Sequence, residues 1–175
     1  MAILLADAGS TKTEWALINV PGDEKHFFTA GINPNYLSEQ EIRLLFGELQ
    51  NDFTRNSDVT EIHYYGTGCA RPAGSDKIRA IARDTFPSAA IHVASDLLAA
   101  AIALLQRRAG LAAILGTGAA LCHYDGQQIT RIAPSAGWML GDEGSGTHLG
   151  KQLLAEYLKG HFPPPSKPLS KPNAN

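Results

Sequence analysis

The stretch Ile3–Thr13, ILLADAGSTKT, decides the fold of this chain. The apolar run that begins at Ala2 and ends at Ala6 has the length and composition of a buried strand, and Asp7 follows it directly. A short turn of small and hydroxyl-bearing residues, Ala8–Thr13, comes next. The sequence therefore predicts a carboxylate at the end of a buried strand, beside a tight polar turn.

This turn has the chemistry of an anion-binding loop. Gly9 can adopt backbone angles that are closed to other residues, and short side chains leave the neighbouring amides open to an anion. Ser10 and Thr11 add hydroxyl donors, and Lys12 adds a charge suited to phosphate. Asp7 can hold Mg²⁺ through water. A solvated hairpin turn is the alternative, because DAGSTKT is neither G-x-G-x-x-G nor a Walker A motif.

Composition places the chain among ordinary soluble domains. It has 175 residues, 44% hydrophobic and 18% charged, and a net charge of −2, so one domain or slightly more is expected and neither nucleic acid nor membrane is an expected partner. Cys69 and Cys122 lie far apart, which disfavours a disulfide framework or a cysteine zinc site. The start of the chain does not resemble a signal peptide, and we expect a cytoplasmic setting.

Hydrophobic periodicity gives the expected order of elements. Ser38–Glu41 is a capping box, and apolar residues recur at helical spacing after it, at Ile42, Leu45, Leu49 and Phe53. Helices are also expected from Ser75, as its cap, to Phe86 and from Asp96 to about Ala109. Further strands are expected at 14–20, 25–29, 61–65, 90–94 and 111–115, and a hairpin turns at Asp125-Gly126 between 119–124 and 127–132.

The order βββαβαβα predicts an α/β fold with a mixed sheet, which binds ligands beyond its strand ends. The loops expected there are 7–13, 66–71, 95–96 and 116–118. We expect a first domain over 1–115 and the start of a second over 116–159, with the phosphate hairpin, the GDEGS loop and a helix. The proline-rich tail, 160–175, is expected to be disordered.

Three later features carry chemistry. Gly116-Thr117-Gly118 repeats the pattern of a strand followed by glycine and hydroxyl, although a bulge or tight corner would need the same residues. Asp96 is either a helix N-cap or a general base for a hydroxyl that attacks phosphorus, and the two roles are compatible. The stretch 137–146, GWMLGDEGSG, offers an aromatic ring and two acids, which suit a sugar; helix capping and core packing are the alternatives.

The chain resembles the N-acetylglucosamine kinase group of the BadF/BadG/BcrA/BcrD ATPase family, in the actin, hexokinase and Hsp70 superfamily. The resemblance covers about residues 3–158 and rests on ADAGSTKTEW, GINPN, ASDLLAAA, ILGTG and MLGDEGSGTHLGK, in that order. It implies a ribonuclease H-like (actin-like ATPase) domain. It also implies an ATP- and Mg²⁺-dependent kinase that transfers the γ-phosphoryl group to the 6-hydroxyl of an amino sugar, N-acetylglucosamine or glucosamine.

The resemblance implies a role for each motif. Asp96 would be the catalytic base and Asp7 a magnesium partner. The phosphate-binding residues would be Gly9, Ser10, Thr11, Lys12, Thr13, Gly116, Thr117 and Gly118. Besides Asp96, the sugar would contact Asn33, Thr67, Gly68, Gly137, Trp138 and Asp142.

Two departures from the family pattern alter this expectation. Many relatives continue the second loop as GTGSN, where this chain has Ala119-Ala120, which removes polar contacts. The family fold also has two such domains, so we expect weak or absent turnover from these 175 residues alone, and an exposed apolar patch that favours a homodimer. The alternatives are a non-catalytic sugar- or nucleotide-binding fragment, and an ATPase that activates a dehydratase through an iron–sulfur cluster, for which the cysteine spacing is unsuitable.

Overall fold

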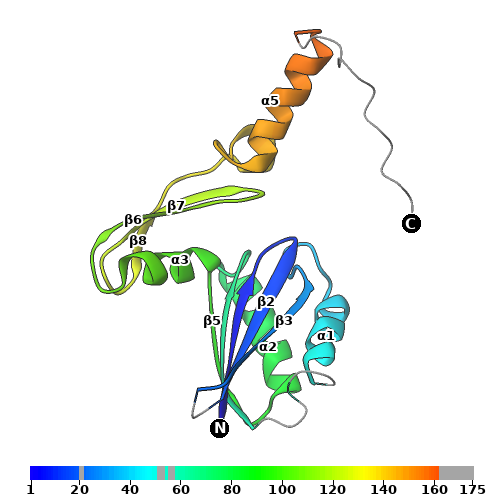
Figure 1. Ribbon diagram of the computed structural model, residues 1–175, viewed down its shortest axis with the longest axis vertical. Coiled ribbons are helices and arrows are strands. Elements are labelled where there is room, and N and C mark those ends of the chain that lie inside the picture. The colour runs from blue at the N-terminus through cyan, green and yellow to red at the C-terminus, as the bar shows by residue number, and fades with distance from the viewer. Residues whose placement is uncertain (20–21, 51–53, 55–57, 162–175) are drawn as a thin grey trace. The chain divides into compact units, whose positions relative to one another are not determined.

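The computed structural model describes residues 1–19, 22–50, 54 and 58–161 (Figure 1). The first eight elements of the chain confirm the expected order βββαβαβα. The strands are β1 (Ala2–Ala8), β2 (Lys12–Asn19), β3 (Glu24–Ala30), β4 (Val59–Gly66) and β5 (Ala90–Ala94). The helices between and after them are α1 (Glu39–Glu48), α2 (Pro72–Thr85) and α3 (Asp96–Leu105).

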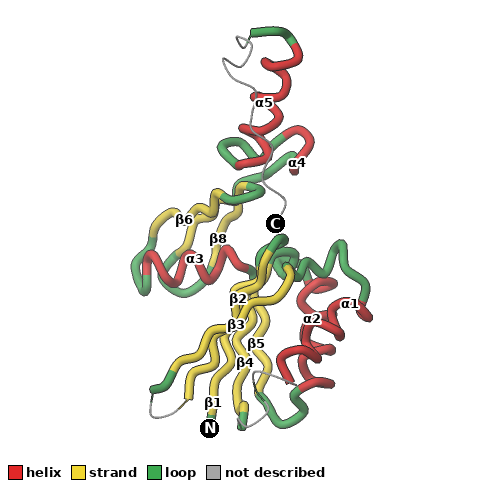
Figure 2. The backbone as a smooth tube through the Cα atoms, turned by 45° about the vertical axis from the view of Figure 1, so that its right-hand side comes forward, coloured by secondary structure: helices red, strands yellow, loops and turns green. Residues whose placement is uncertain are grey.

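These strands form a mixed five-stranded sheet with the order β3-β2-β1-β4-β5. β1 pairs antiparallel with β2 and parallel with β4, so it lies at the centre, where an apolar strand is buried best. α1 and α2 lie together on one side of the sheet (Figure 2). The side chains of β1 alternate accordingly: Leu4 and Ala6 are fully buried beneath the helices, and Leu5 and Asp7 are exposed.

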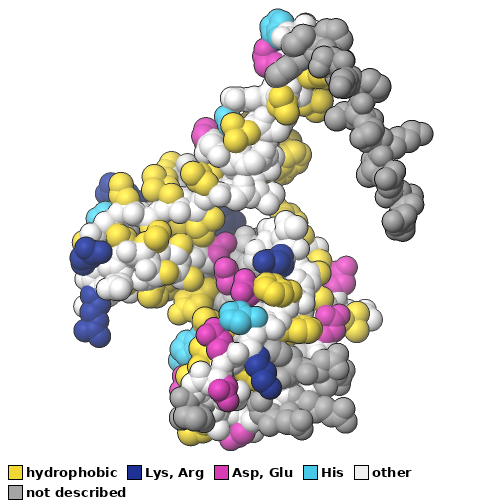
Figure 3. Space-filling model, viewed as in Figure 1, with side chains coloured by type: hydrophobic (Ala, Val, Ile, Leu, Met, Phe, Trp, Pro, Cys, Tyr) yellow, Lys and Arg dark blue, Asp and Glu magenta, His cyan; other side chains and the backbone are white. Residues whose placement is uncertain are grey.

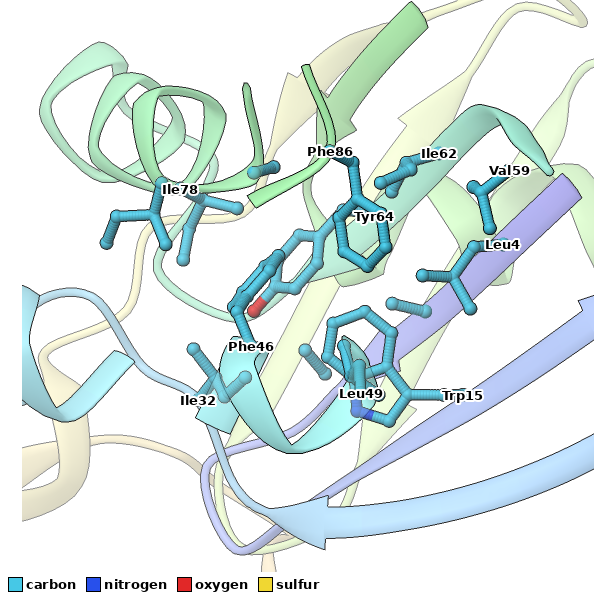
Figure 4. Close-up of a cluster of buried hydrophobic side chains, with 14 of the residues drawn as sticks. Leu4, Trp15, Ile32, Phe46, Leu49, Val59, Ile62, Tyr64, Ile78 and Phe86 are labelled. Atoms are coloured by element: carbon cyan, nitrogen blue, oxygen red, sulfur yellow. The ribbon is translucent and has the colours of Figure 1, made fainter. Parts of the chain in front are cut away.

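Aromatic rings fill the space between this sheet and its helices (Figure 4). Trp15 of β2 meets Phe46 of α1 edge to face, with ring centroids 5.3 Å apart. Tyr64 of β4 stacks on Phe46 at 6.2 Å. Such aromatic pairs stabilise a core by more than the burial of their apolar area alone would give. The Trp15 Nε1 donates to Thr29 Oγ1 at 3.1 Å, which satisfies its polar atom.

A second sheet follows in the order β6-β7-β8, with strands β6 (Gly110–Leu115), β7 (Ala119–Tyr124) and β8 (Ile129–Ile132). Its small core joins Leu97 and Ala101 of α3 to Ala112, Cys122 and Tyr124. The short helix α4 (Gly137–Leu140) and the helix α5 (Gly146–Leu158) complete the described elements.

The chain forms two compact units. Among the described residues, the first comprises 1–114 and 120–133, and the second comprises 115–119 and 134–161. The hairpin 120–133 therefore groups with the first unit, whereas the domain boundary expected near residue 115 assigned it to the second domain. That division into domains stays a prediction.

Several expected helix ends are wrong in detail. α2 begins at Pro72, three residues before Ser75, because proline suits the first helical turn; the Ser75 hydroxyl donates to the Pro72 carbonyl. α3 ends at Leu105 rather than 109, since Gln106 has a positive φ of 56°. Ser95, not Asp96, caps α3 by accepting from the Leu98 amide. The capping box of α1 is present, and Phe53 and most of the tail lie outside the described residues.

The helix α5 carries an apolar stripe that is exposed in the structure. Hydrophobic side chains lie on the surface of α5 (Figure 3). They are Leu149, Leu153, Leu154, Tyr157 and Leu158, each between 58% and 74% exposed. No helix in the described ranges is both long enough and apolar enough to cross a bilayer.

The two buried tyrosines differ in whether their hydroxyl groups are hydrogen-bonded, so the same substitution should affect stability in opposite directions. Tyr64 is fully buried and its hydroxyl has no partner among the described residues, whereas the Tyr124 hydroxyl donates to the Gln106 carbonyl at 3.2 Å. We expect Tyr64→Phe to raise the free energy of unfolding by about 1 kcal/mol, since it removes an unpaired buried polar group. Tyr124→Phe should lower it by about 1 kcal/mol. Urea denaturation of both variants measures this, and equal effects of the same sign would contradict the assignment.

Candidate functional site

The turn between β1 and β2 is tight and leaves amides open. The Gly9 amide donates to the Lys12 carbonyl at 3.0 Å and closes the turn. Within the described part of the chain, the amides of Ser10 and Thr11 donate to no other group. Two successive free amides at a turn form a concavity that attracts an anion. This geometry fits the predicted first phosphate loop.

A second loop, at the end of β3, holds this turn in place. The Gly31 amide donates to the Thr11 carbonyl at 3.0 Å, and the Ile32 amide donates to the Gly9 carbonyl at 3.1 Å. A Cβ atom on Gly31 would lie 2.3 Å from the backbone of Ser10. Only glycine allows the two loops to approach this closely. Sequence reasoning quoted GINPN as a motif but missed this supporting role.

Asn33 links the same turn to the loop after β4. Its side chain is 8% exposed, its Nδ2 donates to Ser10 Oγ at 3.3 Å, and its Oδ1 accepts from the Asn35 amide at 3.0 Å. Gly68, with φ of 78°, lies against it: a Cβ there would be 2.7 Å from Asn33 Oδ1. The Asn33 amide group is thus occupied by the protein, which makes it a residue that positions the two loops.

The other predicted residues of this region differ in what they offer. The Thr67 amide donates to the Ala8 carbonyl at 2.9 Å, which fixes the end of β4 beside the turn. Thr13 is fully buried within β2, so neither its side chain nor its backbone is exposed to a ligand. The Lys12 ammonium lies 3.9 Å from a Glu14 carboxylate oxygen and 4.5 Å from the centre of the Phe28 ring. With 61% of its side chain exposed, Lys12 can still reorient.

Two carboxylates of the first unit, Asp7 and Asp96, interact through their charges. Asp7 is exposed near the end of β1, and Asp96 is half-buried as the first residue of α3, after β5. Burial raises the pKa of Asp96, and the charge of Asp7 raises it further. The Leu97 amide opposes this by donating to Asp96 Oδ1 at 2.8 Å. A carboxylate with a raised pKa at the edge of a site suits a general base.

The second compact unit contains the other predicted loop, Gly116–Gly118. The Gly116 amide donates to the Gly118 carbonyl at 2.9 Å, and the amides of Thr117 and Gly118 have no acceptor among the described residues. The N-terminus of α5 clamps this turn: the Gly146 amide donates to the Gly116 carbonyl at 2.8 Å, and the Thr147 hydroxyl donates to the Thr117 carbonyl at 2.6 Å. This loop too presents open amides.

Asp142 lies against that turn in the same unit. A Cβ atom on Gly118 would be 3.1 Å from Asp142 Oδ2, and the Ser135 hydroxyl donates to Asp142 Oδ1 at 3.0 Å. Asp142 has a φ of 57°, a strained conformation for a residue with a side chain. Trp138 is 60% exposed, and the Lys151 ammonium donates to its carbonyl. Sequence reasoning missed Ser135, and it gave no role to Thr147 and Lys151, although both lie within the quoted motif MLGDEGSGTHLGK.

The structure thus brings the predicted residues together in two groups. One compact unit holds Asp7, Gly9–Thr13, Asn33, Thr67, Gly68 and Asp96. The other holds Gly116–Gly118, Gly137, Trp138 and Asp142. Each group combines open backbone amides with a carboxylate, which is the chemistry of a phosphate or sugar site.

Comparison with known proteins identifies the class of fold to which this chain belongs. No family model matches the chain, and no curated protein matches it. Among solved structures, the chain superposes on MreB5 of Spiroplasma citri bound to ADP with a TM-score of 0.62 at 10% identity, over 90% of this chain and 57% of that one. It also superposes on the putative N-acetylglucosamine kinase of Chromobacterium violaceum, with a TM-score of 0.62 at 22% identity over 91% and 59% of the two chains. The chain therefore has an actin-like ATPase fold, as predicted.

Within this class, a further structure is similar in sequence as well. The putative N-acetylglucosamine kinase of Porphyromonas gingivalis is 36% identical, with a TM-score of 0.82 over 94% of this chain. The predicted relationship to the N-acetylglucosamine kinase group is therefore confirmed. The chain spans 59% of the length of the Porphyromonas gingivalis protein.

The contact between Gly31 and the phosphate turn can be tested against a matched glycine. Gly31→Ala should lower the free energy of unfolding by about 2 kcal/mol or more, because the new Cβ overlaps backbone atoms that cannot move freely. Gly47 lies in α1 with no atom within 4 Å of an added Cβ, so Gly47→Ala should raise stability by about 0.5–1 kcal/mol. Urea denaturation compares them, and a neutral Gly31→Ala would contradict the close approach.

The environment of Asp96 predicts that the difference in stability between the wild type and Asp96→Asn depends on pH. A folded-state pKa above the unfolded value means that ionised Asp96 destabilises the fold as pH rises through its pKa. Asp96→Asn removes that charge and keeps an oxygen for the Leu97 amide. It should therefore melt above the wild type at pH 7, and the difference should shrink at acidic pH. Melting curves at pH 7 and pH 4 measure this; an Asn variant that melts below the wild type at pH 7 would contradict it.

Proposed function

We propose that this chain forms part of an ATP- and Mg²⁺-dependent sugar kinase of the BadF/BadG/BcrA/BcrD type. It would transfer the γ-phosphoryl group of ATP to the 6-hydroxyl of an amino sugar, N-acetylglucosamine or glucosamine. The observation that carries the proposal is the placement of Asp96, with its raised pKa, in one compact unit with the open amides of Ser10 and Thr11. The 36% identity to the Porphyromonas gingivalis protein supports it.

Asp96 would act as the general base. Its carboxylate accepts the proton of the sugar hydroxyl while that oxygen forms its bond to the γ-phosphorus, and the bond from phosphorus to the bridging oxygen of ADP breaks. A raised pKa makes Asp96 a better proton acceptor than an ordinary surface aspartate at neutral pH. Asn33 would fix the position of the loop after β4 relative to the turn between β1 and β2, because it donates to Ser10 and lies against Gly68.

The donor set near Asp7 fits a magnesium ion. Mg²⁺ prefers oxygen ligands and is often held by one or two carboxylates with water, and Asp7 is an exposed carboxylate whose charge reaches Asp96. When bound, the ion would neutralise charge on the phosphates of ATP. In the second unit, the amides of Thr117 and Gly118 would contact phosphate, and Gly137, Trp138 and Asp142 would contact the sugar.

The chemistry of the cysteines does not support the alternative of an ATPase that activates a dehydratase through an iron–sulfur cluster. The sequence contains only Cys69 and Cys122, and both are buried and free. Burial raises the pKa of Cys69 to about 12, which keeps it a thiol. A cluster ligand must be an accessible thiolate. A sugar- or nucleotide-binding role without turnover remains the alternative that the experiment below separates.

The test is ligand binding and phosphoryl transfer by the 175-residue chain. We expect N-acetylglucosamine or glucosamine, and Mg-ATP, to raise the melting temperature more than glucose does, since a ligand of the folded state stabilises it. In a coupled assay of ADP release, we expect any sugar-dependent phosphorylation by this chain to be weak, and we expect Asp96→Asn to abolish it. Asp23→Asn, at an exposed aspartate, is the matched control and should behave as the wild type.

The outcomes separate the alternatives. Stabilisation by an amino sugar without ADP release would indicate a binding role for this chain. Equal ADP release by Asp96→Asn and the wild type would exclude Asp96 as the base. The absence of any melting shift with the three sugars and Mg-ATP would contradict the proposed function.

A further inference from the structure

A group of potential metal ligands lies on the five-stranded sheet, on the face opposite α1 and α2. On β4, Ile62 and Tyr64 are buried in the core beneath those helices, so Glu61 and His63 point to the other face. On the neighbouring strand β5, His92 pairs directly with His63 in the parallel register. Figure 3 shows acidic and histidine side chains on the surface of the first unit. The topology thus places two imidazoles and a carboxylate side by side.

The three side chains are already close. The rings of His63 and His92 are stacked, with centroids 4.8 Å apart and an angle of 16° between their planes. His63 Nε2 lies 3.1 Å from Glu61 Oε2. One ligand atom from each of the three residues can be chosen so that all lie within 4.8 Å of one another. In the described part of the chain, this is the one group of three or more such side chains with that property.

We propose that Glu61, His63 and His92 form a binding site for a divalent late transition metal, Zn²⁺ in particular. Two imidazoles and one carboxylate are a donor set that binds zinc with a fourth position open to water. Ligand atoms at about 2.0–2.1 Å from a tetrahedral zinc lie about 3.3 Å apart, so a small rotation of the side chains brings the three into place. His92 is exposed and free to make that rotation.

The chemistry of the donors selects the metal. Imidazole nitrogen favours Zn²⁺, Ni²⁺ and Cu²⁺, whereas Mg²⁺ and Ca²⁺ favour oxygen. The site is therefore distinct in kind from the carboxylate pair at Asp7 and Asp96. It is also distinct in place, because Asp7 pairs with Tyr65, two residues beyond His63 along β4.

A surface ion pair alone would explain the contact of His63 with Glu61, but it would not account for His92. Among the described residues, the His92 ring contacts the ring of His63 and makes no hydrogen bond. His26, on β3, shows the contrasting arrangement: both ring nitrogens face carboxylates, Glu14 and Glu24, each at 3.1 Å. Glu14, His26 and Glu24 do not form a group with the ligand-atom spacing described above, which makes His26 a matched control on the same sheet.

A bound ion would join the edge strand β5 to β4. β5 pairs with one neighbour only, and it leads through Ser95 into Asp96 and α3. A metal bridge between His63 and His92 would restrain that strand in the folded state. It would therefore stabilise the fold in proportion to the logarithm of the free metal concentration above its dissociation constant.

The test uses the tag-free 175-residue chain and Zn²⁺ itself. We expect Zn²⁺ and Ni²⁺ to raise the melting temperature at micromolar concentrations, and Mg²⁺ and Ca²⁺ at the same concentrations to leave it unchanged. Isothermal titration should show one zinc per chain. His63→Ala and His92→Ala should each weaken binding about tenfold or more, since loss of even an outer partner costs 10–100-fold. His26→Ala should bind as the wild type does.

A spectroscopic measurement separates the site from other zinc ligands. Co²⁺ loaded in place of Zn²⁺ should give the visible absorption of a tetrahedral nitrogen and oxygen site, which His92→Ala should remove even if its melting temperature is unchanged. Zinc affinity that is equal in the wild type and in both His63→Ala and His92→Ala would overturn the proposal. Loss of binding in His26→Ala alone would overturn it as well.

Discussion

The packing of the central strand β1 beneath α1 and α2 is the constraint on which the rest of the first unit depends. Its even-numbered side chains enter the core that Trp15, Phe46 and Tyr64 fill, and its backbone pairs with β2 on one side and β4 on the other. Because side chains alternate along a strand, burying one set forces Asp7 to the opposite face. The polar turn at the end of β1 is thereby held at the edge of a rigid sheet.

That rigidity matters because the turn is supported by backbone and not by long side chains. Gly31 lies against Ser10 and Thr11, and Asn33 bonds to Ser10 while it borders Gly68. An anion site made of amides needs its donors fixed in advance, since amides that must reorganise stabilise a charge less. The second unit uses the same principle, with the N-terminus of α5 clamping the turn at Gly116–Gly118.

Much of the fold could be predicted from the sequence, and the parts that could not share a cause. The capping box at Ser38 and the apolar run of β1 act locally, so their patterns were sufficient. The start of α2 had two competing local signals, proline in the first turn at Pro72 and a capping serine at Ser75. The helix begins at Pro72, so the prediction of Ser75 as its cap is wrong. The stripe on α5 has helical spacing, yet its residues are exposed, because periodicity shows that a face is apolar and not what covers it.

The sequence by itself determined the order of the elements and the identity of the turns that carry glycine, hydroxyl and carboxylate groups. These follow from hydrophobic periodicity and backbone conformational preference, which are properties of neighbouring residues. Only the tertiary structure decided that Asp7 raises the pKa of Asp96, that Asn33 is engaged by Ser10, and that His63 faces His92. Those relations join residues distant in the chain, and they are set by strand order and register, which local pattern does not encode.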